Sequence, residues 1–279
     1  MKKPIAFQGE LGAFSQAAVY QLFGKSVPVL PCPTFETTFR ALMSGKAGAA
    51  VIPIENTLAG SVHENYDHLL RFDVRIVAET NVRIVHNLIA APGVQWKNMR
   101  KVYSHPVALN QCLKFFARNP GIEKVPFYDT AGSVKMIMAE GLKDAAAIAS
   151  EIAAGTYGAT ILKAEIEDDR RNFTRFFRLQ KASAKPLPAP GRQNWKTSIV
   201  FTTRNKPGAL FRGLSAFALR DVNLTKIESR PLRGKPWEYL FYLDVDGREK
   251  DTNVANALRH LGELADFIRV LGSYPAAGA

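Results

Sequence analysis

The N-terminal part of the chain reads IAFQGELGAFSQAAVYQLFGKSVPVLPCPTFETTFRALMSGKAGAAVIPI from Ile5 to Ile54. Short apolar segments alternate here with segments of helical periodicity. The pattern predicts strands at 5–7, 27–30 and 49–54 and helices at 13–23 and 34–44. This order is typical of a mainly parallel sheet covered by helices. Ligands of such sheets bind beyond the carboxyl ends of the strands, where the loops that lead into helices gather.

The first of these loops spans Gln8–Ser15 and contains Gly9 and Gly12 just before a predicted helix. Glycines permit a tight turn, and such a turn would aim the N-terminus of the helix at an anion. Two glycines at this spacing are also common in ordinary turns. The loop is therefore a candidate anion site, although the two glycines taken alone favour an ordinary turn.

The second loop leaves a buried-looking strand with the polar run Glu55, Asn56 and Thr57 and predicts a new helix from Gly60 or Ser61. Polar groups at the end of a core strand need hydrogen-bond partners, and a bound ligand can supply them. The same residues can serve the backbone, Asn56 by forming a turn and Ser61 by capping the helix. Both interpretations stay open here.

The middle of the chain continues the strand and helix alternation. After strand-rich residues 74–90, it predicts a strand at 101–103 and a helix from Pro106 in which Leu109, Cys112, Leu113 and Phe116 share one buried stripe. A polar strand-to-helix turn covers 128–133, a short strand covers 145–149, and Ser104 and His105 precede the Pro106 helix. No carboxylate or nucleophile stands at a fixed offset from His105, which favours a structural role for it.

The C-terminal part is a separate unit of the chain. Residues 181–194 are rich in proline and predict a linker. The segment that follows shows strand-helix-strand-strand-helix-strand order, with a hairpin turn at Gly234 and a strand at 237–245. This is the ferredoxin-like arrangement.

Composition restricts the class of protein. A chain of 279 residues with 47% hydrophobic and 22% charged residues is long enough for two or three packed domains. The net charge of +12 is scattered along the chain without a basic helix, which argues against nucleic acid and is compatible with steering a small anion. Cys32 and Cys112 lie far apart and predict neither a disulfide nor a metal site. The N-terminus lacks the apolar run of a signal peptide and no span is long enough for a membrane, so we expect a cytoplasmic protein.

Several short motifs together resemble one family, the prephenate dehydratases with a C-terminal ACT regulatory domain. The matching segments, in order along nearly the whole chain, are 9–15, 53–62, 104–112, 129–133, the NFTRF sequence at 172–176, the GAL sequence at 208–210 and the ESRP sequence at 228–231. The resemblance implies an α/β fold, with a two-lobed, periplasmic-binding-protein-like catalytic part and a cleft between the lobes. It implies a catalytic domain at 1–180 (one lobe about 1–76 and 160–180, the other about 77–159), a linker at 181–194 and an ACT domain at 195–273.

The implied activity is the conversion of prephenate to phenylpyruvate in phenylalanine biosynthesis, with loss of carbon dioxide and water and without a cofactor or a metal. The resemblance gives Thr174 the role of hydrogen-bond donor to the leaving hydroxyl, Arg175 that of a carboxylate ligand and Glu55 that of a relay or structural partner. The substrate-binding residues that it implies are Asn56, Thr57, Ser61, Ser104, Gln111, Thr130, Ala131, Gly132 and Phe176. Strand alternation would send Thr174 and Arg175 to opposite faces, so a bend or a strand end is expected between 172 and 177.

The ACT resemblance implies feedback inhibition by phenylalanine bound at a subunit interface, in a homodimer or homotetramer. Its implied ligands are Gly208, Ala209, Leu210, Asn223, Leu224, Glu228, Ser229 and Arg230. Two alternatives remain. Arogenate dehydratase acts on a substrate that carries an amino group where prephenate has a keto group, and the turn at 130–133 is the expected place for that choice. A non-catalytic amino-acid-sensing protein would keep the cleft without needing Thr174 beside Arg175.

Overall fold

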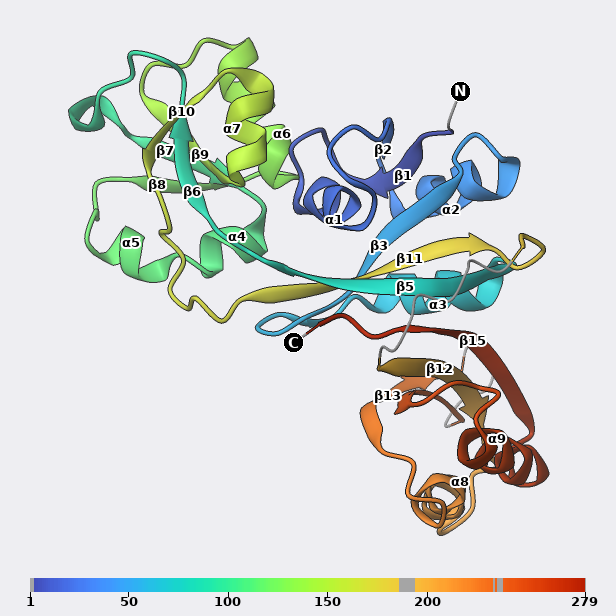
Figure 1. Ribbon diagram of the computed structural model, residues 1–279. Coiled ribbons are helices and arrows are strands. Elements are labelled where there is room, and N and C mark those ends of the chain that lie inside the picture. Colours follow the sequence, from blue (N-terminus) through green and yellow to red (C-terminus); the bar gives the residue numbers. More distant parts are fainter. Residues whose placement is uncertain (1–2, 186–193, 233, 235–237, 279) are drawn as a thin grey trace. The chain divides into compact units, whose positions relative to one another are not determined.

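The computed structural model describes residues 3–185, 194–232, 234 and 238–278, and it divides into two compact units (Figure 1). The first unit comprises Met1–Phe72 and Thr80–Arg178, and the second comprises Asp73–Glu79 and Leu179–Ala279. No helix among the described residues is long and apolar enough to span a membrane.

The first sheet has the strand order β2-β1-β3-β11-β5, with β4 paired to β3. Its strands are β1 (Ile5–Gln8), β2 (Val29–Cys32), β3 (Ala49–Asn56), β4 (Gly60–Ser61), β5 (Val74–Arg83) and β11 (Phe173–Lys181). The helices that follow them are α1 (Phe14–Phe23), α2 (Phe35–Ser44) and α3 (His63–Arg71). β1 runs parallel to both β2 and β3, with Ile5 opposite Val29 and Ala49. The predicted parallel start of the fold is confirmed.

The second sheet has the strand order β10-β6-β9-β7-β8. Its strands are β6 (Asn87–Ala90), β7 (Lys101–Ser104), β8 (Glu123–Pro126), β9 (Ala145–Ala149) and β10 (Thr160–Lys163). The helical segments are η1 (Trp96–Asn98), α4 (Pro106–Asn110), α5 (Leu113–Ala117), α6 (Thr130–Ala139) and α7 (Glu151–Tyr157). Every residue of β9 is buried, because Ala147 joins the core with α6 and α7 while Ile148 joins the core with α4 and α5. Helices therefore cover both faces of this sheet.

The chain crosses between the two sheets twice, after β5 and before β11. The crossings are hydrogen-bonded to each other, because Ile84 N donates to Asn172 O at 2.8 Å and Ile166 N donates to His86 O at 2.8 Å. Both crossings come later than the lobe boundaries expected near 76 and 160, since β5 stays in the first sheet to Arg83 and β10 belongs to the second. The two crossings lie beside each other at one place in the first unit (Figure 1).

Two predicted helices are wrong in detail. Residues Gly60 and Ser61 form β4 on the edge of β3, and the helix begins only at His63 after Val62, so Ser61 does not cap it. The helix from Pro106 breaks at Gln111, where the backbone of Cys112 leaves the helical region, and restarts as α5. After this break Leu113 is 47% exposed, so it does not continue the buried stripe of Leu109 and Cys112.

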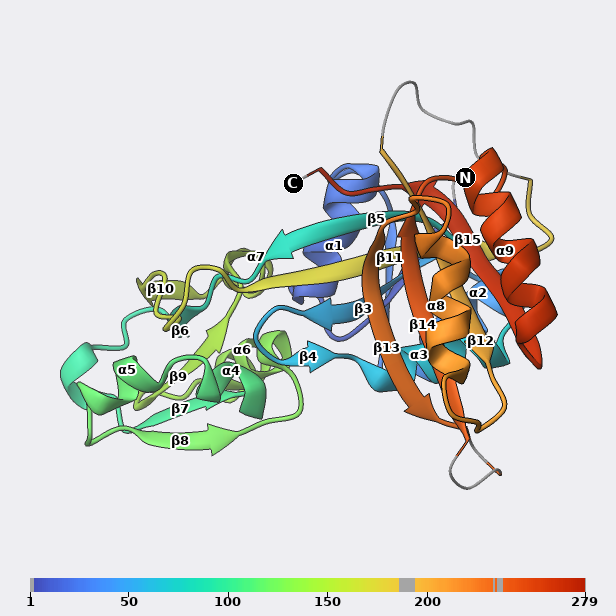
Figure 2. The ribbon, with the colours of Figure 1, turned by 90° about the horizontal axis from the view of Figure 1, so that it is seen from below.

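The second unit contains the predicted strand-helix-strand-strand-helix-strand order. Its elements are β12 (Trp195–Thr202), α8 (Ala209–Ala218), β13 (Leu224–Pro231), β14 (Tyr239–Asp246), α9 (Thr252–Leu264) and β15 (Phe267–Pro275). The strands form an antiparallel sheet in the order β13-β14-β12-β15, and α8 and α9 pack together on one face of it (Figure 2). Residues 186–193 of the predicted linker and 233 and 235–237 of the predicted hairpin lie outside the described residues.

Candidate functional site

A cavity of about 480 Å³ lies in the first unit where loops of the two sheets meet. We call it the cleft. Its lining comes from the carboxyl ends of parallel strands, with Gln8 at the end of β1, Asn56 at the end of β3, His105 after β7 and Tyr128 after β8. This is the edge at which α/β sheets bind ligands, and the volume is that of a small-molecule site.

The hydroxyl of Thr174 is held in the cleft by the side chain of Asn56. Asn56 Nδ2 donates to Thr174 Oγ1 at 2.9 Å and to Asn172 Oδ1 at 2.7 Å. Asn56 Oδ1 accepts from the backbone N–H groups of Leu58 at 3.0 Å and Ala59 at 2.8 Å. Asn56 thus forms the turn that its sequence allows, and the same side chain positions Thr174.

A chain of side-chain hydrogen bonds continues from Asn172 to the second sheet. Asn172 Nδ2 donates to Gln111 Oε1 at 2.9 Å, and His86 Nε2 lies 2.8 Å from the same oxygen. Asn172 and His86 stand on the two crossings, whereas Gln111 follows α4. The crossings and both sheets therefore contribute to one polar network beside Thr174.

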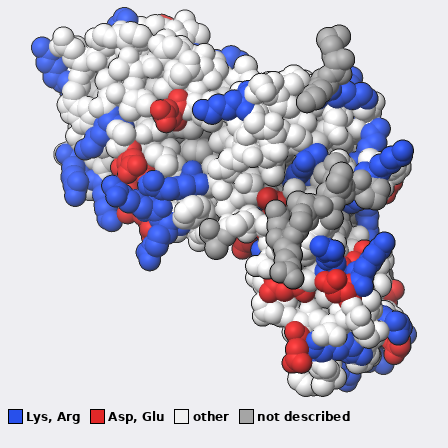
Figure 3. Space-filling model, viewed as in Figure 1, with Lys and Arg blue, Asp and Glu red and all other residues white. Residues whose placement is uncertain are grey.

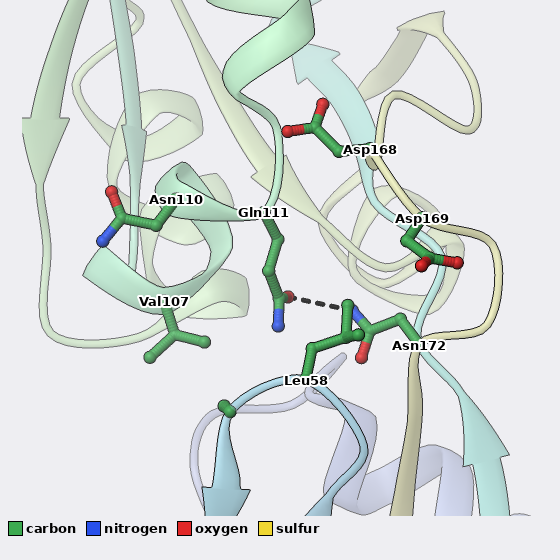
Figure 4. A pocket seen from close by; sticks show the side chains of 8 residues that line it. Leu58, Val107, Asn110, Gln111, Asp168, Asp169 and Asn172 are labelled. Carbon is green, nitrogen blue, oxygen red and sulfur yellow. Dashed lines mark hydrogen bonds between the residues drawn. The ribbon is translucent and has the colours of Figure 1, made fainter.

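A second cavity of about 370 Å³ adjoins the cleft and shares Ala59, Val107 and Gln111 with it (Figure 4). Asp168 and Asp169 line this second cavity, where the Asp168 carboxylate accepts from the N–H groups of Leu113 at 2.8 Å and of Lys114 at 2.9 Å. Figure 4 shows the amide nitrogen of Gln111 directed away from Asn172.

Arg175 does not line the cleft. β11 is a continuous strand from Phe173, without the expected bend, and its alternation puts Thr174 and Phe176 among the lining residues of the cleft. The guanidinium of Arg175 lies 4.8 Å from the centre of the Phe177 ring, on the other face of the strand. The strand begins immediately before Thr174, but this does not bring Arg175 to the same side.

The other predicted site residues divide into two groups. Those that line the cleft together with Thr174 are Asn56, Ser61, Gln111, Thr130 and Phe176. Those that do not line it are Glu55, Thr57, Ser104, Ala131 and Gly132.

Two residues of the second group have clear structural roles. Thr57 Oγ1 donates to Arg171 O at 2.8 Å and accepts from Phe173 N at 3.0 Å, which fastens the crossing before β11. Ser104 is fully buried, and its hydroxyl donates to Ile148 O at 2.6 Å. Both residues support the walls of the site.

The cleft lining contains no lysine or arginine among the described residues, so positive potential must come from elsewhere. The helices α1 and α3 begin at the cleft without a side-chain cap, and helix N-termini carry partial positive charge. The N-terminus of α6 is different, because Asp129 Oδ1 accepts from Gly132 N at 2.7 Å. Burial raises the pKa of the Asp129 carboxyl, and the N–H groups of α6 oppose that rise.

Lysine and arginine side chains gather on the surface around α5 and the crossing before β11 (Figure 3). In this region the side chains of Arg170 and Arg171 are 78% and 87% exposed. Such a field raises the local concentration of anions near the second cavity.

The residues expected to bind phenylalanine are spread over two places in the second unit. Gly208 precedes α8 with a φ of 75°, and Ala209 and Leu210 line a cavity of about 120 Å³ with Tyr239 and Phe241. The predicted ligands between Asn223 and Arg230 lie at or in β13, an edge strand of the sheet, and none lines that cavity.

Sequence reasoning missed His86 as a site residue and assigned His105 a structural role, yet both line the cleft. Burial lowers the pKa of both imidazoles. Asn172 stands out in the sequence only as the start of a motif. No short-range pattern marks His86 or Asn172, because their partners lie 25 and more residues away in the chain.

Comparisons with known proteins agree on one family. The family model "Prephenate dehydratase" matches residues 5–184, and the model "ACT domain" matches residues 197–263. The chain is 45% identical over 280 residues to arogenate dehydratase/prephenate dehydratase 2, chloroplastic, of Arabidopsis thaliana, covering 97% of this chain and 72% of that relative.

Solved structures agree as well. Prephenate dehydratase of Arthrobacter aurescens in complex with L-Phe has a TM-score of 0.88 at 32% identity, covering 98% of this chain and 90% of the other. A structure named "GqqA- a novel type of quorum quenching acylases" has a TM-score of 0.89 at 36% identity, covering 98% and 97%. The two matched models cover most of the chain in the predicted order, and the chain therefore belongs to the prephenate dehydratase family, as a dehydratase with a two-lobed catalytic part and a C-terminal ACT domain.

Proposed function

We propose that the cleft converts prephenate to phenylpyruvate in phenylalanine biosynthesis, with Thr174 as the residue that assists departure of the ring hydroxyl. The bond to the ring carboxylate breaks, its electron pair moves into the ring, and the bond to the hydroxyl breaks as the ring becomes aromatic. Carbon dioxide leaves, and the hydroxyl takes one proton and leaves as water. The residues have to hold a dianion and stabilise the departing oxygen.

The hydrogen bond from Asn56 to Thr174 carries this proposal. Because Asn56 Nδ2 donates to Thr174 Oγ1, the hydroxyl of Thr174 is the acceptor in that pair and its own proton is directed elsewhere. Thr174 is only 9% exposed and lines the cleft, so bulk water competes little for that proton. An aliphatic hydroxyl is a poor acid, and its role is therefore a hydrogen bond to the leaving oxygen rather than complete proton transfer.

Neutral donors and helix N-termini are the groups best suited to the two carboxylates of the substrate. The uncapped ends of α1 and α3 offer backbone N–H groups, and Ser61, Thr130 and Gln111 offer side-chain donors. The resemblance implies that Arg175 binds a substrate carboxylate. In this proposal Arg175 supports β11 instead, since its guanidinium lies over the Phe177 ring. Phe176, 2% exposed, supplies an apolar wall that weakens solvation of the departing carboxylate.

The same site chemistry fits arogenate, whose ammonium group replaces the keto group of prephenate. Asp129 lines the cleft and could accept from that ammonium, although its carboxylate already caps α6. An acylase, as the GqqA structure is named, would need an activated nucleophile. Thr174 receives a hydrogen bond from an amide, which cannot take its proton, so the contact favours dehydration over acyl transfer.

Regulation and assembly complete the proposal. L-phenylalanine inhibits the enzyme by binding the ACT domain, and two or four copies of the chain assemble so that Gly208–Leu210 of one copy meet the edge strand β13 of another. The binding of L-phenylalanine is supported by the L-Phe complex of the related Arthrobacter aurescens structure and by the match to the ACT domain model. The cytoplasmic location expected from sequence stays a prediction, since the Arabidopsis relative is named chloroplastic.

Turnover of two substrates tests the proposal. Purified protein is incubated separately with prephenate and with arogenate, without added cofactor, and phenylpyruvate and phenylalanine are quantified. We expect phenylpyruvate from prephenate at a rate well above the spontaneous reaction. If only arogenate is turned over, to phenylalanine, the protein is an arogenate dehydratase. No turnover of either substrate by folded protein would refute it.

A further inference from the structure

The side-chain hydrogen bonds that link Asn56, Asn172, Gln111 and His86 beside Thr174 have a fixed donor and acceptor order. Backbone N–H groups determine this order. Asn56 Oδ1 accepts from Leu58 N and Ala59 N, which can only donate. Asn56 Nδ2 must therefore face Asn172, and Asn172 Oδ1 must accept this hydrogen bond, at 2.7 Å.

The same logic continues to the histidine. Since the Oδ1 of Asn172 faces Asn56, the Nδ2 of Asn172 faces Gln111. Gln111 Oε1 must therefore accept from Asn172 Nδ2, at 2.9 Å. His86 Nε2 lies 2.8 Å from this oxygen, which has only lone pairs to offer, so Nε2 carries the proton. In the neutral ring the other nitrogen, Nδ1, then has a lone pair, and it is buried with no hydrogen-bond partner among the described residues.

We propose that His86 is a positioning residue for the dehydration reaction, whose Nε2–H holds the carboxamide of Gln111 so that the amide NH₂ donates to the bound substrate. This inference rests on the proposed function. His86 is 2% exposed and its backbone N–H donates to the Glu167 carboxylate at 3.0 Å, so its own position is firmly held. The carboxylate of Glu167 is itself paired with Arg83 at 3.1 Å.

Gln111 has few other constraints on its orientation. Its Oε1 accepts hydrogen bonds from Asn172 Nδ2 and His86 Nε2, and its amide nitrogen faces away from Asn172 (Figure 4). With the His86 donor removed, the amide keeps one partner and gains rotational freedom. The amide NH₂ of Gln111 would then point toward the substrate for a smaller fraction of the time. Loss of one such hydrogen bond corresponds to a fall of about 10-fold in rate.

A measurement that does not depend on activity tests the first half of the inference. The ¹⁵N NMR spectrum of the histidine side chains distinguishes a protonated from an unprotonated ring nitrogen. We expect His86 to be in the neutral Nε2–H form at pH 8. Its ring ¹⁵N signals are assigned as those that disappear from the spectrum of His86→Gln. A neutral Nδ1–H form would overturn the inference, whether or not the protein turns over prephenate.

A double-mutant cycle tests the second half. His86→Leu should lower kcat/KM for prephenate about 10-fold in the wild-type chain and by less than about 2-fold in the Gln111→Ala chain, because there is no carboxamide left to position. His86→Gln keeps a donor near the place of Nε2 and should restore kcat/KM to within about 3-fold. His68→Leu removes another buried histidine, on α3 and outside the cleft lining, and serves as the control for general loss of packing.

Each remaining outcome is decisive. Equal losses from His86→Leu in both backgrounds, or equal losses in His86→Leu and His86→Gln, would show that His86 does not act through Gln111. If His86→Leu does not fold, the comparison of His86→Gln with wild type in the two Gln111 backgrounds and the NMR assignment still test the inference. A wild-type chain without turnover would refute the proposed function and leave the tautomer result to stand by itself.

Discussion

Replacement of Asn56 by aspartate removes the amide donor that holds Thr174 and Asn172, while the side chain keeps nearly the same shape. The new carboxylate still accepts from Leu58 N and Ala59 N, so the turn is retained. The hydrogen bonds that Asn56 Nδ2 donates to Asn172 Oδ1, Thr174 Oγ1 and Phe173 O are lost. The Thr174 hydroxyl then has to donate to the carboxylate instead of the substrate.

The magnitude follows from these contacts. The substrate loses the Thr174 donor and the Asn172 contact is broken, at about 1 kcal/mol each. The added negative charge repels a dianion across the cleft by about 1 kcal/mol, if the charges are about 5 Å apart in a well-solvated site. The sum of about 3 kcal/mol corresponds to a fall of about 100-fold in kcat/KM for prephenate.

The assay is steady-state turnover of prephenate by Asn56→Asp. Asn119→Asp is the matched control, since Asn119 Nδ2 also donates to a carbonyl, that of Phe115 at 2.7 Å, but lies outside the cleft lining. A kcat/KM for Asn56→Asp within about 3-fold of wild type, in folded protein, would refute the reasoning about Thr174 and its donor.

Three further predictions concern packing, pH and regulation. Gly12→Ala should lower the free energy of unfolding by about 3 kcal/mol in denaturant titration, because the added Cβ would lie 2.5 Å from Ala153 Cα at a φ of 91°. Gly24→Ala, at a φ of 83° with nothing within 4 Å, should cost about 1 kcal/mol, and equal losses would contradict the packing argument. Burial lowers the pKa of His86, so below the unfolded value of 6.5 the unfolded chain binds more protons and the unfolding free energy falls with falling pH. In His86→Gln the free energy of unfolding should fall less between pH 8 and pH 5 than in wild type. An equal fall in both proteins would contradict this prediction. L-phenylalanine should inhibit turnover and raise the melting temperature, and absence of both effects would exclude binding to the ACT domain.

Periodicity in the sequence was enough to predict the parallel first sheet and the antiparallel unit after the linker, because both depend on local apolar patterns. It failed where tertiary contacts compete with local patterns. Gly60 and Ser61 pair with the end of β3 instead of starting a helix, and the helix from Pro106 breaks where the carbonyl of Gln111 accepts from Asp168 N at 2.7 Å.

The candidate site shows the same division. The family motifs identified Asn56, Gln111 and Thr174, which meet in the cleft. Arg175 was misplaced because the motif does not reveal that β11 keeps its regular alternation through it. His86 could not be found at all, since its importance depends on the orientation of an amide that only the folded network determines.

The hydroxyl of Thr174 is the centre of the proposed mechanism, and its removal tests that mechanism most directly. The measurement is kcat for prephenate in Thr174→Val, which keeps the shape of the side chain but has no hydroxyl, beside Thr174→Ser, which keeps the hydroxyl. We expect kcat to fall about 100-fold in Thr174→Val with KM changed by less than about 3-fold, and to stay within about 10-fold of wild type in Thr174→Ser. A folded Thr174→Val enzyme with the kcat of wild type would contradict the account.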